Sequence, residues 1–435
     1  MVLVRAARTR VAVTASEAPG QQKQRAQQPQ EPSAKPSPAL VALLGRSRAA
    51  LLTSLAVAGQ RDAWPAVQQL LAPFQSPLPP PPLTDTVPPS SLMDDDSSTA
   101  RLLGIEVHYN LRSSSPAQTS SSASLQRDGT KHTLVLCFHG FNGSTVSYET
   151  VLQGFADAVH GSALAFDRPP FGLTQRAGIA ERLFTTSGAA ELAAELVNHV
   201  GHVGGSSSWS RIILVGHSAG AGVALATARL LAPGTVAGLV LVSPAVPASG
   251  DDSFLSRADL GSLIRFAITR SVLALDGPGL AFVRASTIKR AQDVRASRNI
   301  GYGGGKPAPQ SVVDAYLAPL QADAWDTASL AAFRSFEVPP APALSQLASV
   351  PVCVIQGAQD EVVPAAGVRK LVDAMRGSGV ACTYVELASA GHLPLEEDPD
   401  ACVAAFTAWL PDMEFVLSAE TNKREAQMEM ATAVR

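Results

Sequence analysis

A chain of 435 residues with 46% hydrophobic and 16% charged residues can bury a sizeable core, which excludes a wholly disordered protein. The formal net charge is -3, and acidic and basic residues are interspersed along the chain. The protein therefore lacks the strong overall positive charge that would attract nucleic acid, and a small neutral substrate is favoured. The length fits one large α/β domain with additional segments.

The first 60 residues are rich in Arg, Ala and Ser and contain only two acidic residues, Glu17 and Glu31. This composition is typical of an organellar transit peptide, and a compact apolar region like that of a secretory signal is missing. The longest apolar stretch, Ala39 to Gly59, contains Arg46 and Arg48, each of which would cost roughly 2.5 to 3.5 kcal/mol at the bilayer centre. No transmembrane segment is therefore predicted, and an ordinary disordered extension is the alternative to a transit peptide.

Two segments rich in Pro, Gln, Asp or Ser, Gln21 to Pro38 and Pro77 to Ser98, indicate linkers, because they bury too little apolar surface to order themselves. The predicted domains are a transit peptide with linkers (1–98), an α/β core (99–246 and 344–412), a helical cap (247–343) and a polar tail (413–435).

Beyond the linkers, short apolar runs alternate with helical patterns, which predicts an α/β fold with a mostly parallel sheet and helices on both faces. The expected strands are Leu102 to Tyr109, Leu134 to Phe138, Ala163 to Phe166, Ile212 to Val215, Leu239 to Val242, Val352 to Gln356 and Thr383 to Leu387. The expected helices are Ala189 to His199, Ala219 to Leu231, Ala365 to Met375 and Ala401 to Leu410. The Ser-rich stretch Ser113 to Ser124 is interpreted as a long hairpin loop between the first two strands.

The alternation stops between Pro244 and Val350, where helical patterns such as Phe254 to Ala274 and Ser311 to Leu320 occur without a strand run. An insertion of this length is too long for a plain loop, so a helical cap over the site is predicted between two strands. Six basic residues crowd the middle of this cap with only Asp293 as a local acid: Arg284, Lys289, Arg290, Arg295, Arg298 and Lys306. A solvated helical face is the favoured interpretation, and attraction of an anionic group or a membrane surface is the alternative.

A candidate nucleophile follows the fourth of the expected strands. The run Ile212 to Val215 leads into Gly216-His217-Ser218-Ala219-Gly220 and then into an Ala-rich helix, which is the setting of a G-x-S-x-G nucleophile elbow. Ser218 must lie on a strained turn, and a Cβ at Gly216 or Gly220 would clash with neighbouring elements. The N–H of Ala219, at the start of the helix, is available to a developing oxyanion.

A second oxyanion donor is expected in His139-Gly140-Phe141, directly after the strand Leu134 to Phe138. We assign the donor to the N–H of Phe141 and a supporting role to Gly140. His139 and His217 are interpreted as packed, hydrogen-bonded residues and not as catalysts.

The base and its orienting acid are expected downstream of the nucleophile, in the order Ser, acid, His. His392 is the only histidine that follows Ser218. Asp360 lies in the loop after the strand Val352 to Gln356 and would orient His392. Adjacent Glu361 competes for this role, and Asp251 or Asp252 is a weaker alternative.

No metal or cofactor site is predicted. The four cysteines (Cys137, Cys353, Cys382 and Cys402) are widely spaced and form neither a C-x-x-C pair nor a zinc pattern, so they are expected to be free thiols in a reducing compartment.

The order and spacing of these four motifs resemble the α/β-hydrolase superfamily, of the AB hydrolase-1 type, over about Arg101 to Asp412. Asp167-Arg168-Pro169-Pro170-Phe171-Gly172-Leu173-Thr174 occupies the place of the superfamily's D-x-x-G-x-G-x-S turn, where Asp167 is interpreted as structural. Pro170 and Phe171 replace the small residues that are usual in this turn. A turn with these replacements is similar to that of plant, algal and cyanobacterial members, many with plastid transit peptides and most without an assigned substrate. The resemblance implies a chloroplast protein, with the mitochondrion or cytoplasm as alternatives.

The predicted function is a serine hydrolase that forms an acyl-enzyme on a carboxylic ester, thioester or lipid ester of a small molecule. A serine at the elbow differs from the aspartate of similar epoxide hydrolases and haloalkane dehalogenases. A ligand-binding protein with little turnover, and an amide or carbon–carbon bond hydrolase with the same triad, stay open as alternatives. Peripheral membrane contact also stays open, and the sequence predicts no oligomeric state.

Overall fold

The computed structural model describes residues 86–115, 133–203, 209–249, 260–335, 342, 344–414 and 417. The predicted transit peptide, the rejected membrane-spanning stretch, the first predicted linker and nearly all of the predicted C-terminal tail therefore lie outside the described residues, as do Asp251 and Asp252. Residues 86–98 of the second predicted linker are described, and they include a 3-10 helix at Pro89–Leu92 and the first residues of a strand that begins at Ser97.

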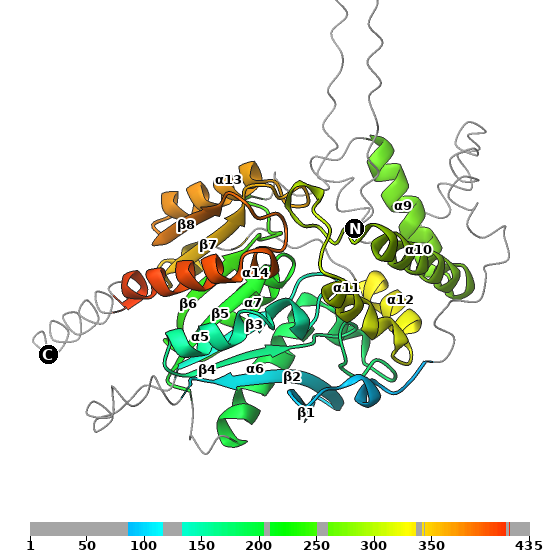
Figure 1. Ribbon diagram of the computed structural model, residues 1–435, viewed down its shortest axis with the longest axis horizontal. Helices are drawn as coiled ribbons and strands as arrows, with labels where there is room; N and C mark the ends of the chain where they lie inside the picture. Colours follow the sequence, from blue (N-terminus) through cyan, green and yellow to red (C-terminus); the bar gives the residue numbers. More distant parts are fainter. Residues whose placement is uncertain are drawn as a thin grey trace, which may run out of the picture.

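An eight-stranded sheet forms the centre of the molecule, in the order β1-β2-β4-β3-β5-β6-β7-β8 (Figure 1). The strands are β1 Ser97–Leu102, β2 Ile105–Ser113, β3 Thr133–Phe138, β4 Ser162–Phe166, β5 Arg211–His217, β6 Val236–Val242, β7 Val352–Gly357 and β8 Cys382–Leu387. The pairs β1–β2 and β2–β4 are antiparallel, and the other neighbouring strands are parallel. The predicted α/β class with a mostly parallel sheet is confirmed.

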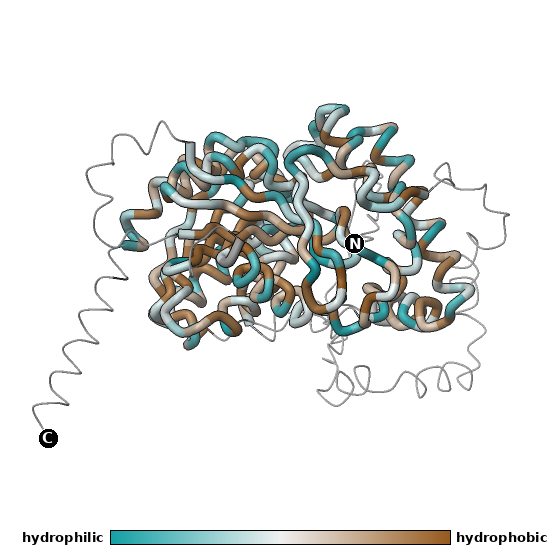
Figure 2. Tube along the Cα trace, turned by 90° about the horizontal axis from the view of Figure 1, so that it is seen from below, coloured by the Kyte–Doolittle hydropathy of each residue, from teal (hydrophilic) through white to brown (hydrophobic). Residues whose placement is uncertain are grey.

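Both faces of the sheet are covered by helices because alternate residues of each inner strand point to opposite sides. On β3, Leu134 and Leu136 belong to one buried cluster, whereas Val135 and Cys137 belong to the other. The first cluster includes α6 (Thr186–Val203), α7 (Gly220–Ala228) and α13 (Ala365–Gly377), and the second includes α5 (Leu152–Ala158) and a helix over residues 399–414. Figure 2 shows the consequence, with hydrophobic strands in the middle and helices of mixed character outside.

The cap follows β6 and ends before β7. Its helices are α9 (Leu260–Ala274), α10 (Asp276–Ser297), α11 (Gln310–Leu317) and α12 (Trp325–Ser335), and they gather at one end of the molecule (Figure 1). Val283 and Trp325 are buried in one small cluster within the cap, and Val294 and Val313 are buried in another. A helical cap between two strands was predicted and is confirmed, while the exact domain limits stay predictions.

The N-terminal edge of the sheet differs from the prediction. The expected strand Leu102 to Tyr109 is interrupted, because Leu103 and Gly104 form a turn with φ of 49° and 88° that joins β1 to β2. The expected hairpin between the first two predicted strands is also wrong, since β2 pairs with β1 and β4 and not with β3. Residues 116–132, which hold most of the Ser-rich stretch, lie outside the described residues.

None of the described helices is long and apolar enough by itself to cross a membrane. Phe266–Ala274 and Asp276–Ser297 meet that standard only as a pair, and the chain bends by 119° between them.

Candidate active site

Ser218 lies on the turn between β5 and α7 with a φ of 53°, in the left-handed region that costs a non-glycine residue energy. A Cβ added at Gly216 would lie 2.6 Å from the Cα of Ala221, and one added at Gly220 would lie 2.1 Å from the carbonyl oxygen of Phe138. Both distances are shorter than a Cβ tolerates, so this tight strand-to-helix turn requires glycine at both positions, as expected.

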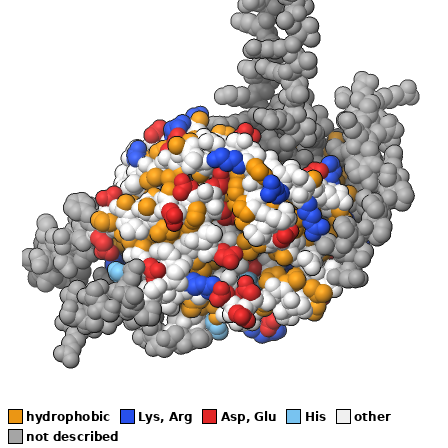
Figure 3. All heavy atoms as spheres, viewed as in Figure 1, with side chains coloured by type: hydrophobic (Ala, Val, Ile, Leu, Met, Phe, Trp, Pro, Cys, Tyr) orange, Lys and Arg blue, Asp and Glu red, His pale blue; other side chains and the backbone are white. Residues whose placement is uncertain are grey.

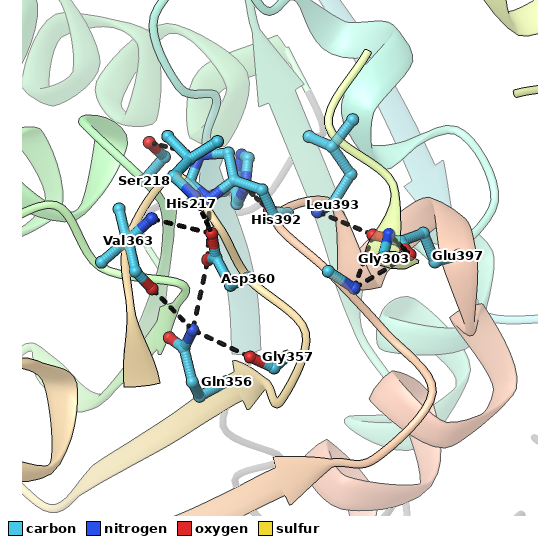
Figure 4. Close-up of polar contacts among 12 residues, drawn as sticks. His217, Ser218, Gly303, Gln356, Gly357, Asp360, Val363, His392, Leu393 and Glu397 are labelled. Carbon is cyan, nitrogen blue, oxygen red and sulfur yellow. Dashed lines mark hydrogen bonds and ion pairs between the residues drawn. The ribbon is translucent and has the colours of Figure 1, made fainter. Parts of the chain in front are cut away.

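The structure brings the three predicted catalytic side chains together in one line of hydrogen bonds (Figure 4). Ser218 Oγ lies 3.0 Å from His392 Nε2, and His392 Nδ1 lies 2.8 Å from Asp360 Oδ2. Asp360 follows β7 and His392 follows β8, and the carboxyl ends of β5 to β8 share one edge of the sheet because these strands are parallel. A carboxylate only accepts, so Nδ1 carries the proton and Nε2 is free to accept the Ser218 hydroxyl proton.

Asp360 is held as a carboxylate by four donors. Its Oδ1 accepts hydrogen bonds from the N–H groups of Val362 (2.8 Å) and Val363 (2.7 Å), and its Oδ2 accepts from Gln356 Nε2 (3.2 Å) as well as from His392. Burial acts to raise the pKa of Asp360, but the hydrogen bond and charge of His392 together with the two backbone donors outweigh it and lower that pKa. The competing acid Glu361 is exposed.

The two predicted oxyanion donors lie on neighbouring loops because β3 and β5 are paired, with Phe138 opposite Gly216. A Cβ added at Gly140 would lie 3.0 Å from the Cβ of Ser218, so the loop that carries Phe141 passes directly beside the candidate nucleophile. Within the described residues, neither the N–H of Phe141 nor that of Ala219 donates a hydrogen bond. Two backbone donors next to Ser218 are therefore available to a ligand.

Two further histidines support the loops of this site. His217 Nε2 donates to the carbonyl oxygen of His392 (2.8 Å), and His139 Nδ1 donates to the carbonyl oxygen of Gly140 (2.8 Å). Burial is the largest cause that lowers the pKa of His217 to about 3 and that of His139 to about 4. Both rings are therefore neutral at physiological pH, and each fixes the backbone of a loop, as expected for packed residues.

Asp167 is buried under the turn that follows β4. Its carboxylate accepts from His108 Nδ1 and from the N–H groups of Thr145 and Leu173, each at 2.7 Å. A Cβ added at Gly172 would overlap this carboxylate, at 1.9 Å. This arrangement agrees with the structural interpretation of Asp167.

Sequence reasoning missed a carboxylate beside the site. Glu396, in α14 (Pro394–Glu397), accepts hydrogen bonds from the hydroxyls of Tyr302 and Tyr316, both from the cap, and Tyr316 also contacts Ser147 Oγ at 2.9 Å. Burial is the main cause that raises the pKa of Glu396 from 4.5 to about 7. No local pattern indicated this contact, because the tyrosines lie 80 or more positions earlier in the chain.

We expect Glu396→Gln to stabilise the protein near pH 8 more than near pH 4. The folded state binds the Glu396 proton more tightly than the unfolded chain, so the free energy of unfolding falls as pH rises from 4.5 to about 7. Glutamine removes this penalty and keeps an oxygen that accepts from Tyr316. Denaturant titrations at both pH values check the result, with the exposed residue Asp400→Asn as control, and an equal change at both pH values would contradict it.

The six basic residues that crowd the middle of the cap are all exposed. Arg284 forms an ion pair with Asp326 (2.7 Å), and Lys289 forms one with Asp293 (3.1 Å). Figure 3 shows basic and acidic side chains interspersed over the face in view. These contacts agree with the favoured interpretation of a solvated face, and attraction of an anionic group or a membrane surface there stays an untested alternative.

The four cysteines are free, and all but the partly buried Cys382 are buried. Among the described residues, no group of three or more His, Cys, Asp or Glu side chains is arranged to hold a metal ion.

The profile of the alpha/beta hydrolase family matches residues 134–405, more than half of the chain. No curated protein matches the chain by sequence. Similar solved structures include a malate-bound thermophilic esterase from Thermogutta terrifontis, with 20% identity, a TM-score of 0.50 and coverage of 73% of this chain and 98% of that chain. A putative aryl esterase from Burkholderia cenocepacia is 19% identical, with a TM-score of 0.50 and coverage of 73% of this chain and 98% of that chain. The structure of a protein named DBJA is 17% identical, with a TM-score of 0.51 and coverage of 74% of this chain and 99% of that chain.

At these identities the likeness to solved structures shows the shared fold. The family match covers the strands that carry Ser218, Asp360 and His392 and the whole cap between β6 and β7. The chain therefore belongs to the alpha/beta hydrolase family, and the predicted superfamily and hydrolase class are confirmed.

Proposed function

We propose that the protein hydrolyses carboxylic esters of small molecules through an acyl-enzyme on Ser218. The observation that carries this proposal is the continuous contact from Ser218 Oγ through His392 to Asp360, next to two unused backbone donors. A hydroxyl, a neutral imidazole and an oriented carboxylate in this order are what nucleophilic acyl transfer requires.

In the proposed reaction, Ser218 Oγ attacks the ester carbonyl carbon while His392 Nε2 takes the hydroxyl proton. The N–H groups of Phe141 and Ala219 stabilise the oxyanion, and Asp360 stabilises the imidazolium. When the carbon–oxygen bond to the leaving group breaks, His392 returns the proton to the departing alcohol. Water then attacks the acyl-enzyme with His392 as base, and a carboxylic acid and free Ser218 result.

An aromatic cluster on the loop beside the candidate nucleophile favours an apolar or aryl group on the substrate. Phe141, beside the nucleophile, packs against Phe171 at a ring-centroid distance of 5.3 Å and against Phe333 of α12 at 5.7 Å. All three rings are partly exposed. The esterase names of two of the similar structures, one of them a putative aryl esterase, agree with this substrate class.

The test is turnover by the full-length protein on p-nitrophenyl and naphthyl esters of increasing acyl length, with matched thioesters and amides. We expect steady hydrolysis of esters, with a higher kcat/KM for apolar and aryl groups than for polar ones, and slower cleavage of the amides. If ligands bind tightly but no ester is hydrolysed and no burst occurs, the binding-protein alternative replaces the proposal.

We also propose a plastid location, which rests on the composition of the first 60 residues and on the resemblance of the turn after β4 to plastid-targeted hydrolases. Residues 1–98 fused to a fluorescent reporter should accumulate in chloroplasts. Accumulation in mitochondria or a diffuse cytoplasmic signal would overturn the proposal.

A further inference from the structure

The carboxylate of Glu397 accepts hydrogen bonds from three backbone N–H groups, and two of these belong to the residues on either side of His392. Gly391 N–H lies 2.9 Å from both carboxylate oxygens, and Leu393 N–H lies 3.1 Å from Oε1. Figure 4 shows this carboxylate between the loop of the candidate base and the cap. One side chain thus fixes the backbone both before and after His392.

The third donor comes from the cap. Gly303, in the connection between α10 and α11, donates its N–H to Glu397 Oε2 at 2.7 Å. Two residues earlier, the carbonyl oxygen of Gly301 accepts from the N–H of His392 itself at 3.0 Å. The cap loop 301–305 is therefore joined to the loop of His392 by one direct hydrogen bond and by a second link through the Glu397 carboxylate, which binds both Gly303 and the flanks of His392.

The contact between these loops leaves no room for side chains. A Cβ added at Gly303 would lie 2.8 Å from the nitrogen of Gly391, and one added at Gly391 would lie 2.4 Å from the nitrogen of Gly303. Glycine at both positions allows the two backbones to meet closely enough for a single carboxylate to bind both. The N–H of His392 points to Gly301, its carbonyl to His217 and its Nδ1 to Asp360. Every polar group of this residue other than Nε2, which faces Ser218, is thus held by a neighbouring loop.

We propose that Glu397 is a positioning residue for His392, and that the cap loop 301–305 completes this positioning. The inference rests on the proposed function and adds that the base is aligned through the cap as well as through Asp360. A misplacement of a catalytic group by about 1 Å can cost on the order of 100-fold in rate, so the loss of these contacts should act on the chemical step.

The experiment compares Glu397→Ala, Glu397→Gln and Gly303→Ala in the full-length protein on the best ester for the wild type. We expect Glu397→Ala and Gly303→Ala to lower kcat by about 10- to 100-fold with KM changed less than about threefold. Glu397→Gln should fall between Glu397→Ala and the wild type, because its one amide oxygen can replace only part of the acceptor set. Fluorophosphonate labelling of Ser218 should slow in parallel with kcat.

The matched controls are Asp400→Asn, an exposed acid near Glu397 in sequence, and Gly277→Ala in α10, where an added Cβ meets nothing within 4 Å. Both should keep wild-type kcat. If Glu397→Ala does not fold, Gly303→Ala carries the test, since it leaves the carboxylate in place. A kcat within twofold of wild type, or a rise in KM at constant kcat, would overturn the positioning role while ester turnover by the wild type still supports the proposed function. Absence of turnover in the wild type would instead remove the proposed function.

Discussion

Ser218→Ala is expected to abolish labelling by a fluorophosphonate probe and to lower ester hydrolysis by roughly 10⁴- to 10⁶-fold. Alanine removes the attacking oxygen but leaves the oxyanion donors and the binding surface, so weak residual turnover is expected. The measurement is gel fluorescence after labelling, together with single-turnover kinetics on the same ester.

Ser243 offers a matched control for this substitution. It lies directly after β6, has a positive φ of 44°, and its buried hydroxyl has no hydrogen-bond partner among the residues that the structure describes. It therefore shares the strained backbone and burial of Ser218 but not the contact with His392. Ser243→Ala should label like the wild type, and labelling that survives in Ser218→Ala would show that another residue is the nucleophile.

Asp360→Asn should lower kcat by about 10⁴-fold, whereas Glu361→Gln should leave it unchanged. The asparagine amide either offers a donor to His392 or turns its single oxygen away from the N–H groups of Val362 and Val363. Either outcome weakens the control of the imidazole tautomer and removes the charge that stabilises the imidazolium. The measurement is kcat across the neutral pH range, where the lowered pKa of Asp360 keeps the wild-type carboxylate ionised.

The contrasting exposures of the two acids make this comparison informative. The Asp360 side chain is 0% exposed and contacts His392, while Glu361 is exposed. If Glu361→Gln lost activity and Asp360→Asn kept it, the acid would have been assigned to the wrong residue. Equal circular dichroism spectra of both variants would separate a catalytic effect from unfolding.

The parts of the site that the sequence predicted are those with local signals. Ser218 lies between a strand rich in β-branched residues and an Ala-rich helix. The glycines at Gly216 and Gly220 are required by close contacts with residues of the turn itself and with the neighbouring strand β3. His392 could be selected by chain order alone. For Asp360 the sequence left Glu361 as a competitor, and the fold separates the two by burial and by the hydrogen bond to His392.

The parts that escaped prediction depend on contacts between distant residues. The turn at Leu103 and Gly104 has no strong local signature. Strand β2 pairs with β4 although β3 lies between them in the sequence. Glu397 and Gly303 are 94 positions apart, so their hydrogen bond leaves no periodic trace in the sequence. Such contacts are specified by tertiary packing and become visible only in the folded chain.

The position of the cap in the chain has a consequence for how its substrate range could be altered. Ser218 precedes the insertion, and Asp360 and His392 follow it, so a foreign cap could be exchanged between β6 and β7 without disturbing the order of the three. Such a chimera would still have to present a glycine where Gly303 meets Gly391, with a free N–H for Glu397. A cap library built on this scaffold should therefore vary α9 to α12 and keep the short glycine connection constant.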